Sequence, residues 1–205
     1  MRFSSLIVTA CALVAVAFPV SLDAQQARPK QPGERWVELF NGRDLGGWVN
    51  VGNEKWTVED GYLRTDQEYK SFHLFLRFKT EANGNSGVYF HTQFKPGTVD
   101  VSQGRQFEID RVLGHHSCGV YGDNAGWKAW PAPEFEGLLR PTDWNDMLLK
   151  VEDNHYECYL NGVKMLDFTD PKMGASDGYI ALQLHSGGEG NMRFKDIRIL
   201  DLSRR

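Results

Sequence analysis

The sequence predicts an all-β domain, a β-sandwich or jelly roll, and three observations support this fold class. Apolar and polar residues alternate with a period of two, which is typical of half-buried strands. Turn signals such as Asn161-Gly162 separate these runs. No long stretch has helical periodicity, and the 21 glycines suit a chain with many tight turns. Antiparallel strands at this density favour a sandwich over an α/β fold.

The strands follow from this alternation in chain order. An apolar residue stands at every second position in 72–78, and Val88 and Phe90 alternate in the same way. Phe107 and Ile109 form the next run, and 144–168 reads as a meander of three strands with an Asn-Gly turn before the last. A final core strand is expected around 180–184. Each run directs one face to a core and leaves a polar face opposite.

Residues 113–143 interrupt this pattern with two tryptophans, three prolines and one expected short strand at 119–122. Long ordered loops on a sandwich often carry function. A loop that covers a site and a surface loop held by its own aromatic residues both remain open.

The N-terminal end of the chain differs in composition from the rest. Residues 1–24 are predicted to be a secretory signal, with Arg2 before an apolar run at 6–20 and Ala24 as the cleavage position. That run is too short for a comfortable membrane span. Residues 25–33 are a polar, proline-bearing lead-in, and 34–202 form one domain. The expected location is the periplasm or the exterior.

Charge and cysteines limit the partners. The net charge is −4 and no basic run appears, so nucleic acid is not an expected partner. Cys118 and Cys158 remain after removal of the signal. Export permits a disulfide between them, but their spacing does not show that they meet. Their separation excludes a CxxC zinc site, and the sequence does not define the oligomeric state.

The stretch 104–112, GRQFEIDRV, is the strongest functional signal. Residues two apart on a strand share a face, so Gln106, Glu108 and Asp110 line one surface while Phe107 and Ile109 enter the core. If the apolar residues of the neighbouring strands also face the core, further polar side chains are expected on the same face: Asn85, Tyr89, His91, Gln183 and His185. Acids and imidazoles in one hollow supply the groups of acid–base catalysis. A solvated outer face is the alternative, because antiparallel sheets commonly have one.

Other motifs are weaker. Trp127 and Trp130 in the loop are the tryptophans best placed to stack on a sugar. The pair His115-His116 has metal-binding groups but is more typical of a surface loop. No GxSxG elbow, P-loop or HExxH motif is present.

An ordered series of motifs carries a family resemblance. The series is WVELFNGRDLGGW, KWTVEDGYLRT, GNSGVYFHT, FEID, GVYG, DWND, YLNGVKMLDF, ALQLHSGG and MRFKDIRIL. It resembles the 3-keto-glucoside lyase/hydratase domain, also called the 3-keto-disaccharide hydrolase domain, from Trp36 to Leu202. The resemblance implies a concanavalin-like jelly-roll sandwich and a small carbohydrate substrate that is already oxidised at C3.

The resemblance also implies a mechanism. A ketone at C3 acidifies the C2 proton, so a base can remove it, the enolate expels the aglycone from C1, and water then adds back. Glu108, Asp110 and His185 are the expected catalytic residues. The expected substrate-binding residues are Asn85, His91, Tyr121, Trp127 and Gln183. At His91 the family often has arginine, so a role for His91 is the weakest part of this assignment.

Alternatives remain open for the cofactor and for the function. The sequence specifies no cofactor, although Glu108, Asp110 and His185 suit a divalent cation on the enolate oxygen. FEIDRV also resembles the E-I-D-x-E strand of family 16 glycoside hydrolases, but Val112 replaces their third acid, which disfavours ordinary hydrolysis. A non-catalytic carbohydrate-binding module is the other alternative, because the same fold serves lectins.

Overall fold

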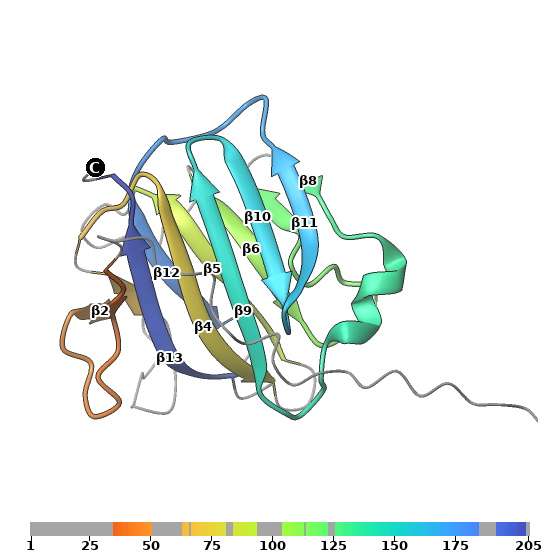
Figure 1. Cartoon of the computed structure of the whole chain (residues 1–205), viewed down its shortest axis with the longest axis horizontal. Helices are drawn as coiled ribbons and strands as arrows, with labels where there is room; N and C mark the ends of the chain where they lie inside the picture. Colours follow the sequence, from red (N-terminus) through yellow and green to blue (C-terminus); the bar gives the residue numbers. More distant parts are fainter. Residues whose placement is uncertain are drawn as a thin grey trace, which may run out of the picture.

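The structure is a computed structural model that describes residues 35–50, 63–65, 67–80, 84–93, 104–112, 114–122, 126–184 and 192–203. Two antiparallel β-sheets face each other across the core (Figure 1), so the predicted all-β sandwich is confirmed. The predicted signal and lead-in, 1–24 and 25–33, lie outside the described residues. No helix among the described residues is long and apolar enough to cross a membrane.

The first sheet, here called sheet A, has six strands. Their order across the sheet is β1 (Val37–Glu38), β13 (Met192–Asp201), β4 (Phe72–Thr80), β9 (Asn145–Glu152), β10 (His155–Leu160) and β11 (Val163–Thr169). Strands β9, β10 and β11 are the predicted meander. The turn between β10 and β11 has positive φ at Asn161 (50°) and Gly162 (86°), as a two-residue hairpin turn of this kind requires.

The second sheet, sheet B, has seven strands and carries the polar face that concerns function. Its order is β2 (Trp48–Asn50), β3 (Leu63–Thr65), β12 (Tyr179–Leu184), β5 (Asn85–Thr92), β6 (Arg105–Asp110), β7 (Val120–Gly122) and β8 (Gly126–Ala129). β7 is the short strand expected in the long loop. β8 and the 3-10 helix η2 (Pro133–Leu138), in the same loop, were not predicted.

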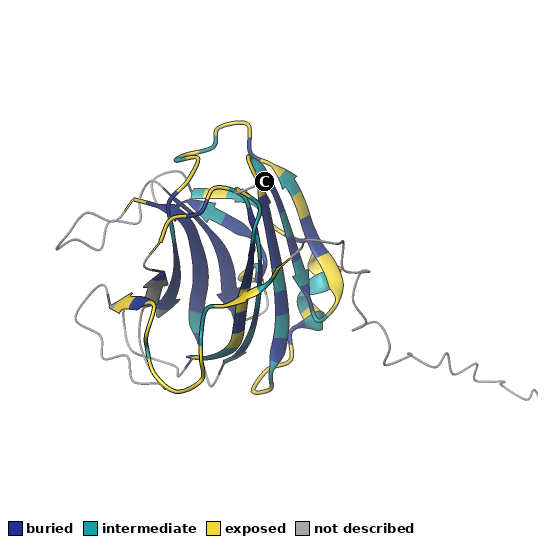
Figure 2. Ribbon diagram, turned by 60° about the vertical axis from the view of Figure 1, so that its left-hand side comes forward, coloured by how far each residue is buried: buried dark blue, intermediate teal, exposed yellow. Residues whose placement is uncertain are grey.

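The core forms where the inner faces of the sheets meet. Every second residue of β4 is buried, and on sheet B Phe107 and Ile109 are fully buried, as the alternation predicts. Tyr156 of β10 packs edge-on against Phe90 with ring centroids 5.0 Å apart, which joins the two sheets. Figure 2 shows buried residues along the middle of the strands and exposed residues mostly in loops and at edges.

A disulfide also joins the two sheets. Cys118, just before β7, pairs with Cys158 of β10, and their Cα atoms lie 5.6 Å apart. The two cysteines are 40 residues apart in the sequence, and the loop that the bond closes includes η2. The question that the sequence left open is therefore answered: the two cysteines meet.

The expectation for His91 is corrected by a β-bulge. Thr92 pairs with Tyr179 and Tyr89 with Ala181, so β5 has one more residue than β12 between these pairs. His91 adopts a φ of 54°, and its side chain is buried and packs edge-on against the ring of Phe90. Its Nε2 lies 2.7 Å from the carbonyl oxygen of Lys70. The bulge turns His91 away from the polar face that holds Asn85 and Tyr89.

Burial of His91 predicts a pH dependence of stability. Desolvation lowers the pKa of His91, and the Lys70 carbonyl opposes this only in part. The folded protein therefore holds His91 neutral, while the unfolded chain binds a proton below a pH of about 6.5. We expect the free energy of unfolding to fall between pH 7 and pH 5. Asparagine tolerates positive φ and does not titrate, so the free energy of unfolding of His91→Asn should fall less steeply over this range. Urea unfolding at pH 7, 6 and 5 measures the difference. Parallel curves would exclude His91 as a cause.

Candidate active site

The polar face of sheet B forms one pocket. The cavity has a volume of about 470 Å³ and is lined by Asn85, Tyr89, Gln106, Glu108, Asp110, Gly114, His115, His116, Tyr121, Trp127 and Gln183. Six of the residues expected from the sequence lie here: Asn85, Glu108, Asp110, Tyr121, Trp127 and Gln183. His91 does not line this cavity, and His185 lies outside the described residues.

Strand register explains this gathering. Gly87 of β5 pairs with Glu108 on one side and with Gln183 on the other. Cross-strand partners place their side chains on the same face, so an acid and an amide flank a position that has no side chain. Asn85 pairs with Asp110 in the same way and brings its amide between the two acids.

A continuous hydrogen-bond network joins these side chains. Asn85 Nδ2 donates to Glu108 Oε1 at 3.0 Å and to Asp110 Oδ2 at 2.9 Å. Gln106 Nε2 donates to the other oxygen of Glu108 at 2.9 Å and to Gln183 Oε1 at 3.1 Å. Both oxygens of Glu108 therefore meet amide donors, which hold this buried carboxylate in one orientation.

The network needs a glycine at position 87. A Cβ atom built on Gly87 would lie 2.2 Å from Gln106 Nε2 and 2.5 Å from the Gln106 amide carbon. The missing side chain leaves the slot in which the Gln106 amide reaches both Glu108 and Gln183. The three atoms nearest to that Cβ all belong to the Gln106 side chain, so a substitution should displace this side chain and its amide.

Gly87→Ala should therefore impair the site more than the fold. We expect catalytic turnover to fall by up to about 100-fold, because small displacements of positioned groups are costly. The free energy of unfolding should change little, since Gly87 does not have positive φ. Gly137→Ala is the matched control, because a Cβ there meets no atom within 4 Å. Full activity in the Gly87 variant would show that the Gln106 contact is dispensable.

Asp110 differs from Glu108 in that it holds a histidine. Its Oδ2 lies 2.9 Å from His115 Nδ1, and its Oδ1 accepts the backbone N–H of Val112 at 2.7 Å. The Asp110 side chain is 5 % exposed and that of His115 is 56 % exposed. This is a carboxylate–imidazole pair in which a buried acid orients a histidine at the pocket wall. In the sequence, only the weak His115-His116 signal points to this pair.

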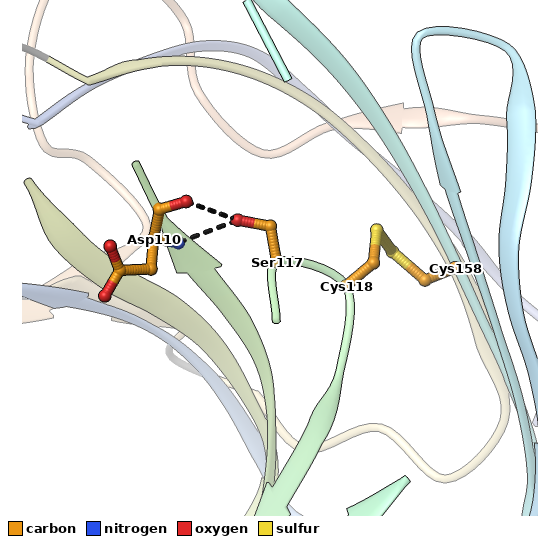
Figure 3. Close-up of a disulfide and its surroundings, with 4 residues drawn as sticks. All are labelled: Asp110, Ser117, Cys118 and Cys158. Atoms are coloured by element: carbon orange, nitrogen blue, oxygen red, sulfur yellow. Dashed lines mark hydrogen bonds between the residues drawn. A yellow bond between two sulfur atoms is a disulfide. The ribbon is translucent and has the colours of Figure 1, made fainter. Parts of the chain in front are cut away.

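A clamp fixes the loop that carries His115 (Figure 3). Ser117 Oγ accepts the backbone N–H of Asp110 at 2.9 Å and donates to the Asp110 carbonyl at 2.6 Å. The next residue, Cys118, donates its N–H to the Glu108 carbonyl at 2.8 Å and is bonded to Cys158. The disulfide thus anchors to sheet A the segment that supplies His115.

The acids of the pocket are poorly suited to a metal at Asp110. Both Asp110 oxygens already accept protein N–H groups, and one of them also contacts His115. The residues around Asp110 therefore do not fit a bound cation. Elsewhere in the described chain, His155, Glu157 and Asp167 bring ligand atoms together on sheet A. Lys164 contacts both of these acids, at 2.9 and 2.7 Å, and Lys150 contacts Glu157, so two ammonium groups already balance the two carboxylates.

Comparison with known proteins places the chain in a family. Residues 35–200 match the 3-keto-alpha-glucoside-1,2-lyase-like domain. The chain belongs to this family. The resemblance found in the sequence motifs is therefore confirmed.

Individual relatives are more distant. The chain is 26 % identical over 105 residues to a 3-keto-disaccharide hydrolase of Bacteroides thetaiotaomicron, and the match covers 39 % of this chain and 36 % of that protein. A candidate glycosyl hydrolase of Parabacteroides distasonis has a similar structure, with 25 % identity, a TM-score of 0.61 and coverage of 82 % and 94 % of the two chains. A carbohydrate-binding module of family 66 from Bacillus subtilis shares the fold, with 13 % identity, a TM-score of 0.52 and coverage of 81 % and 95 %.

Proposed function

We propose that this protein cleaves 3-keto-glycosides by elimination followed by hydration, so that the net reaction is hydrolysis. The observation that supports this most is the meeting of Glu108, Asp110 and His115 in one amide-lined pocket. Membership of the lyase-like family and the name of the Bacteroides relative support the same substrate class.

The reaction needs a base and an acid at different atoms of the substrate. A base removes the C2 proton, and the electron pair forms an enolate with the C3 ketone. The pair then returns to form the C1–C2 double bond as the C1–O bond breaks, and an acid protonates the departing oxygen. Addition of water across that double bond gives the free 3-keto sugar. No covalent bond to a carboxylate is required.

We assign the base to Glu108. It is buried, lines the cavity, and is held in one orientation by amides from two sides. Gln183 supplies an N–H group in the same cavity for the C3 oxygen, where charge develops. His185 was the other expected base and stays a proposal, since it lies outside the described residues.

We assign proton donation to His115, with Asp110 as its positioning residue. Nδ1 faces Asp110, which leaves Nε2 to give a proton to the leaving oxygen. Asp110 itself does not suit the role of nucleophile, because its Oδ2 contacts the His115 imidazole as well as the Asn85 amide, and its Oδ1 accepts the Val112 N–H. This favours elimination over ordinary glycoside hydrolysis, as does the half-exposed Val112 in the place of a third acid.

His115→Asn should separate this role from a structural one. The variant should lower kcat by about 100-fold or more and remove one limb of the pH profile of kcat, while the melting temperature stays close to that of the wild type. The matched control is His73→Asn, on sheet A, where the histidine contacts Glu152. An unchanged pH profile in the His115 variant would contradict the assignment.

The function is tested with the purified protein and paired substrates. A 3-keto-glucoside and its unoxidised parent are incubated with and without a chelator, and aglycone release is followed. Release from the keto compound alone supports elimination, and equal release from both contradicts it. Release from neither would favour a binding module, and loss of activity with chelator would restore a role for a cation.

Export to the periplasm or the exterior remains part of the proposal. The disulfide between the sheets supports this proposal, because such bonds form and persist in oxidising compartments. Fractionation of cells that express the full chain tests this, with the mature N-terminus expected near residue 25 (from the signal expected at 1–24).

A further inference from the structure

One wall of the pocket is aromatic and unusually exposed. His116, Tyr121 and Trp127 line the cavity, and Trp130 stacks on His116 beside it; these four residues are here called the aromatic rim. Trp127 is 38 % and Trp130 is 52 % exposed, which is unusual for residues of this size. None of the assignments above gives the rim as a whole a role.

The rim is fixed before any ligand arrives. The rings of His116 and Trp130 stack 5.1 Å apart at an angle of 17°, and Trp127 meets His116 edge-on at 5.2 Å. Tyr121 meets Trp127 at 5.3 Å. His116 Nδ1 lies 3.1 Å from Glu136 Oε1, so η2 holds this ring in place. Rings that are already ordered lose little entropy when a ligand binds.

A glycine allows the indole of Trp127 to lie against the sheet. A Cβ atom on Gly119 would lie 2.8 Å from the six-membered ring of Trp127. The close packing holds one side of the indole, and its exposed fraction remains available at the pocket.

The register places the rim at a fixed distance from the acids. Gln106 pairs with Tyr121, and Tyr121 pairs with Trp127, so these three residues form one row across β6, β7 and β8. Trp127 is therefore two strand spacings from β6, about 10 Å. Glu108 stands two residues along β6 from this row. A sugar whose C2 lies at Glu108 and whose C1 oxygen lies at His115 can thus extend its C1 substituent towards the rim.

We propose that the aromatic rim is the subsite for the leaving group and that it selects aglycones with a ring that presents an apolar face, either an aryl group or a second sugar. This inference rests on the proposed function. Both kinds of ring present an apolar face that can stack on an indole, whereas a small alkyl aglycone cannot. Trp127 is the specificity-determining residue, and Trp130 and His116 support it.

The test compares three 3-keto-glucosides that differ only in aglycone: methyl, phenyl and glucosyl. Trp127→Ala should raise KM about 3- to 10-fold for the two ring-bearing substrates and leave KM for the methyl compound and all three kcat values nearly unchanged. Trp127→Phe should restore most of the loss. Trp144→Ala, just before β9 of sheet A where Lys195 covers the indole, is the control and should change nothing.

Each other outcome is also informative. An equal rise for all three aglycones, or no rise for any, overturns the subsite. The larger effect among the phenyl and glucosyl compounds tells which ring the rim prefers. If the wild type releases no aglycone at all, the proposed function fails, and tryptophan fluorescence with the unoxidised parents then tests the rim by itself. If the ring-bearing parents quench the fluorescence of the wild type and Trp127→Ala abolishes this quenching, the subsite is upheld. If methyl glucoside gives the same response as the ring-bearing parents, the subsite is rejected.

Discussion

Replacing Glu108 by glutamine should abolish most aglycone release from a 3-keto-glucoside, with kcat lower by about 10²- to 10⁴-fold. The variant keeps the size of the side chain but cannot accept the C2 proton as a carboxylate does. One of its contacts, to Asn85 or to Gln106, also changes from an acceptor to a donor. Single-turnover and steady-state release assays measure the loss.

A matched acid on the other sheet controls for the loss of charge. Glu152→Gln removes a carboxylate near the end of β9, where it contacts His73, far from the pocket lining. It should keep the wild-type rate. Comparable activity in the Glu108 and Glu152 variants would remove Glu108 from the mechanism, provided that circular dichroism shows both to be folded.

Removal of the disulfide should have the largest effect on stability. Cross-linking residues 40 apart is expected to stabilise the fold by about 4 kcal/mol through the unfolded chain. Cys118→Ala/Cys158→Ala should therefore unfold at a much lower urea concentration than the wild type. Alanine is the suitable replacement because both cysteines are fully buried among apolar residues.

The same variant should lose activity while it is still folded. Without the bond, the segment with Ser117 and His115 is held to β6 by hydrogen bonds alone, so kcat should fall more than KM rises. A reducing agent should reproduce both effects in the wild type and have none in the double variant. A stable and fully active double variant would show that the clamp does not depend on the disulfide.

The fold and half of the site could be predicted because strands obey a simple rule. The period of two fixes which side chains share a face, and it correctly separates Gln106, Glu108 and Asp110 from Phe107 and Ile109. Asn85 and Gln183 follow from the same rule applied to the neighbouring strands. Their gathering around Gly87 was not foreseen, because it depends on the register between strands.

The failures arise where the backbone leaves that rule. The bulge in β5 gives His91 positive φ and turns it into the interior, and no local signal marks the extra residue. His115 reaches Asp110 because Gly114 and His116 take positive φ in the loop, which a pattern of polarity does not encode. Cys118 and Cys158 meet because the two sheets face each other, so their pairing depends on tertiary structure.

Elimination is tested most directly by the origin of the hydrogen at C2. In heavy water, the purified protein releases the aglycone from a 3-keto-glucoside while NMR follows C2 and C4 of the sugar, and a sample without protein corrects for spontaneous exchange. Our account predicts one solvent deuteron at C2 for each molecule released, with C4 at the spontaneous level. Release of aglycone from a sugar that keeps its original C2 hydrogen would contradict it.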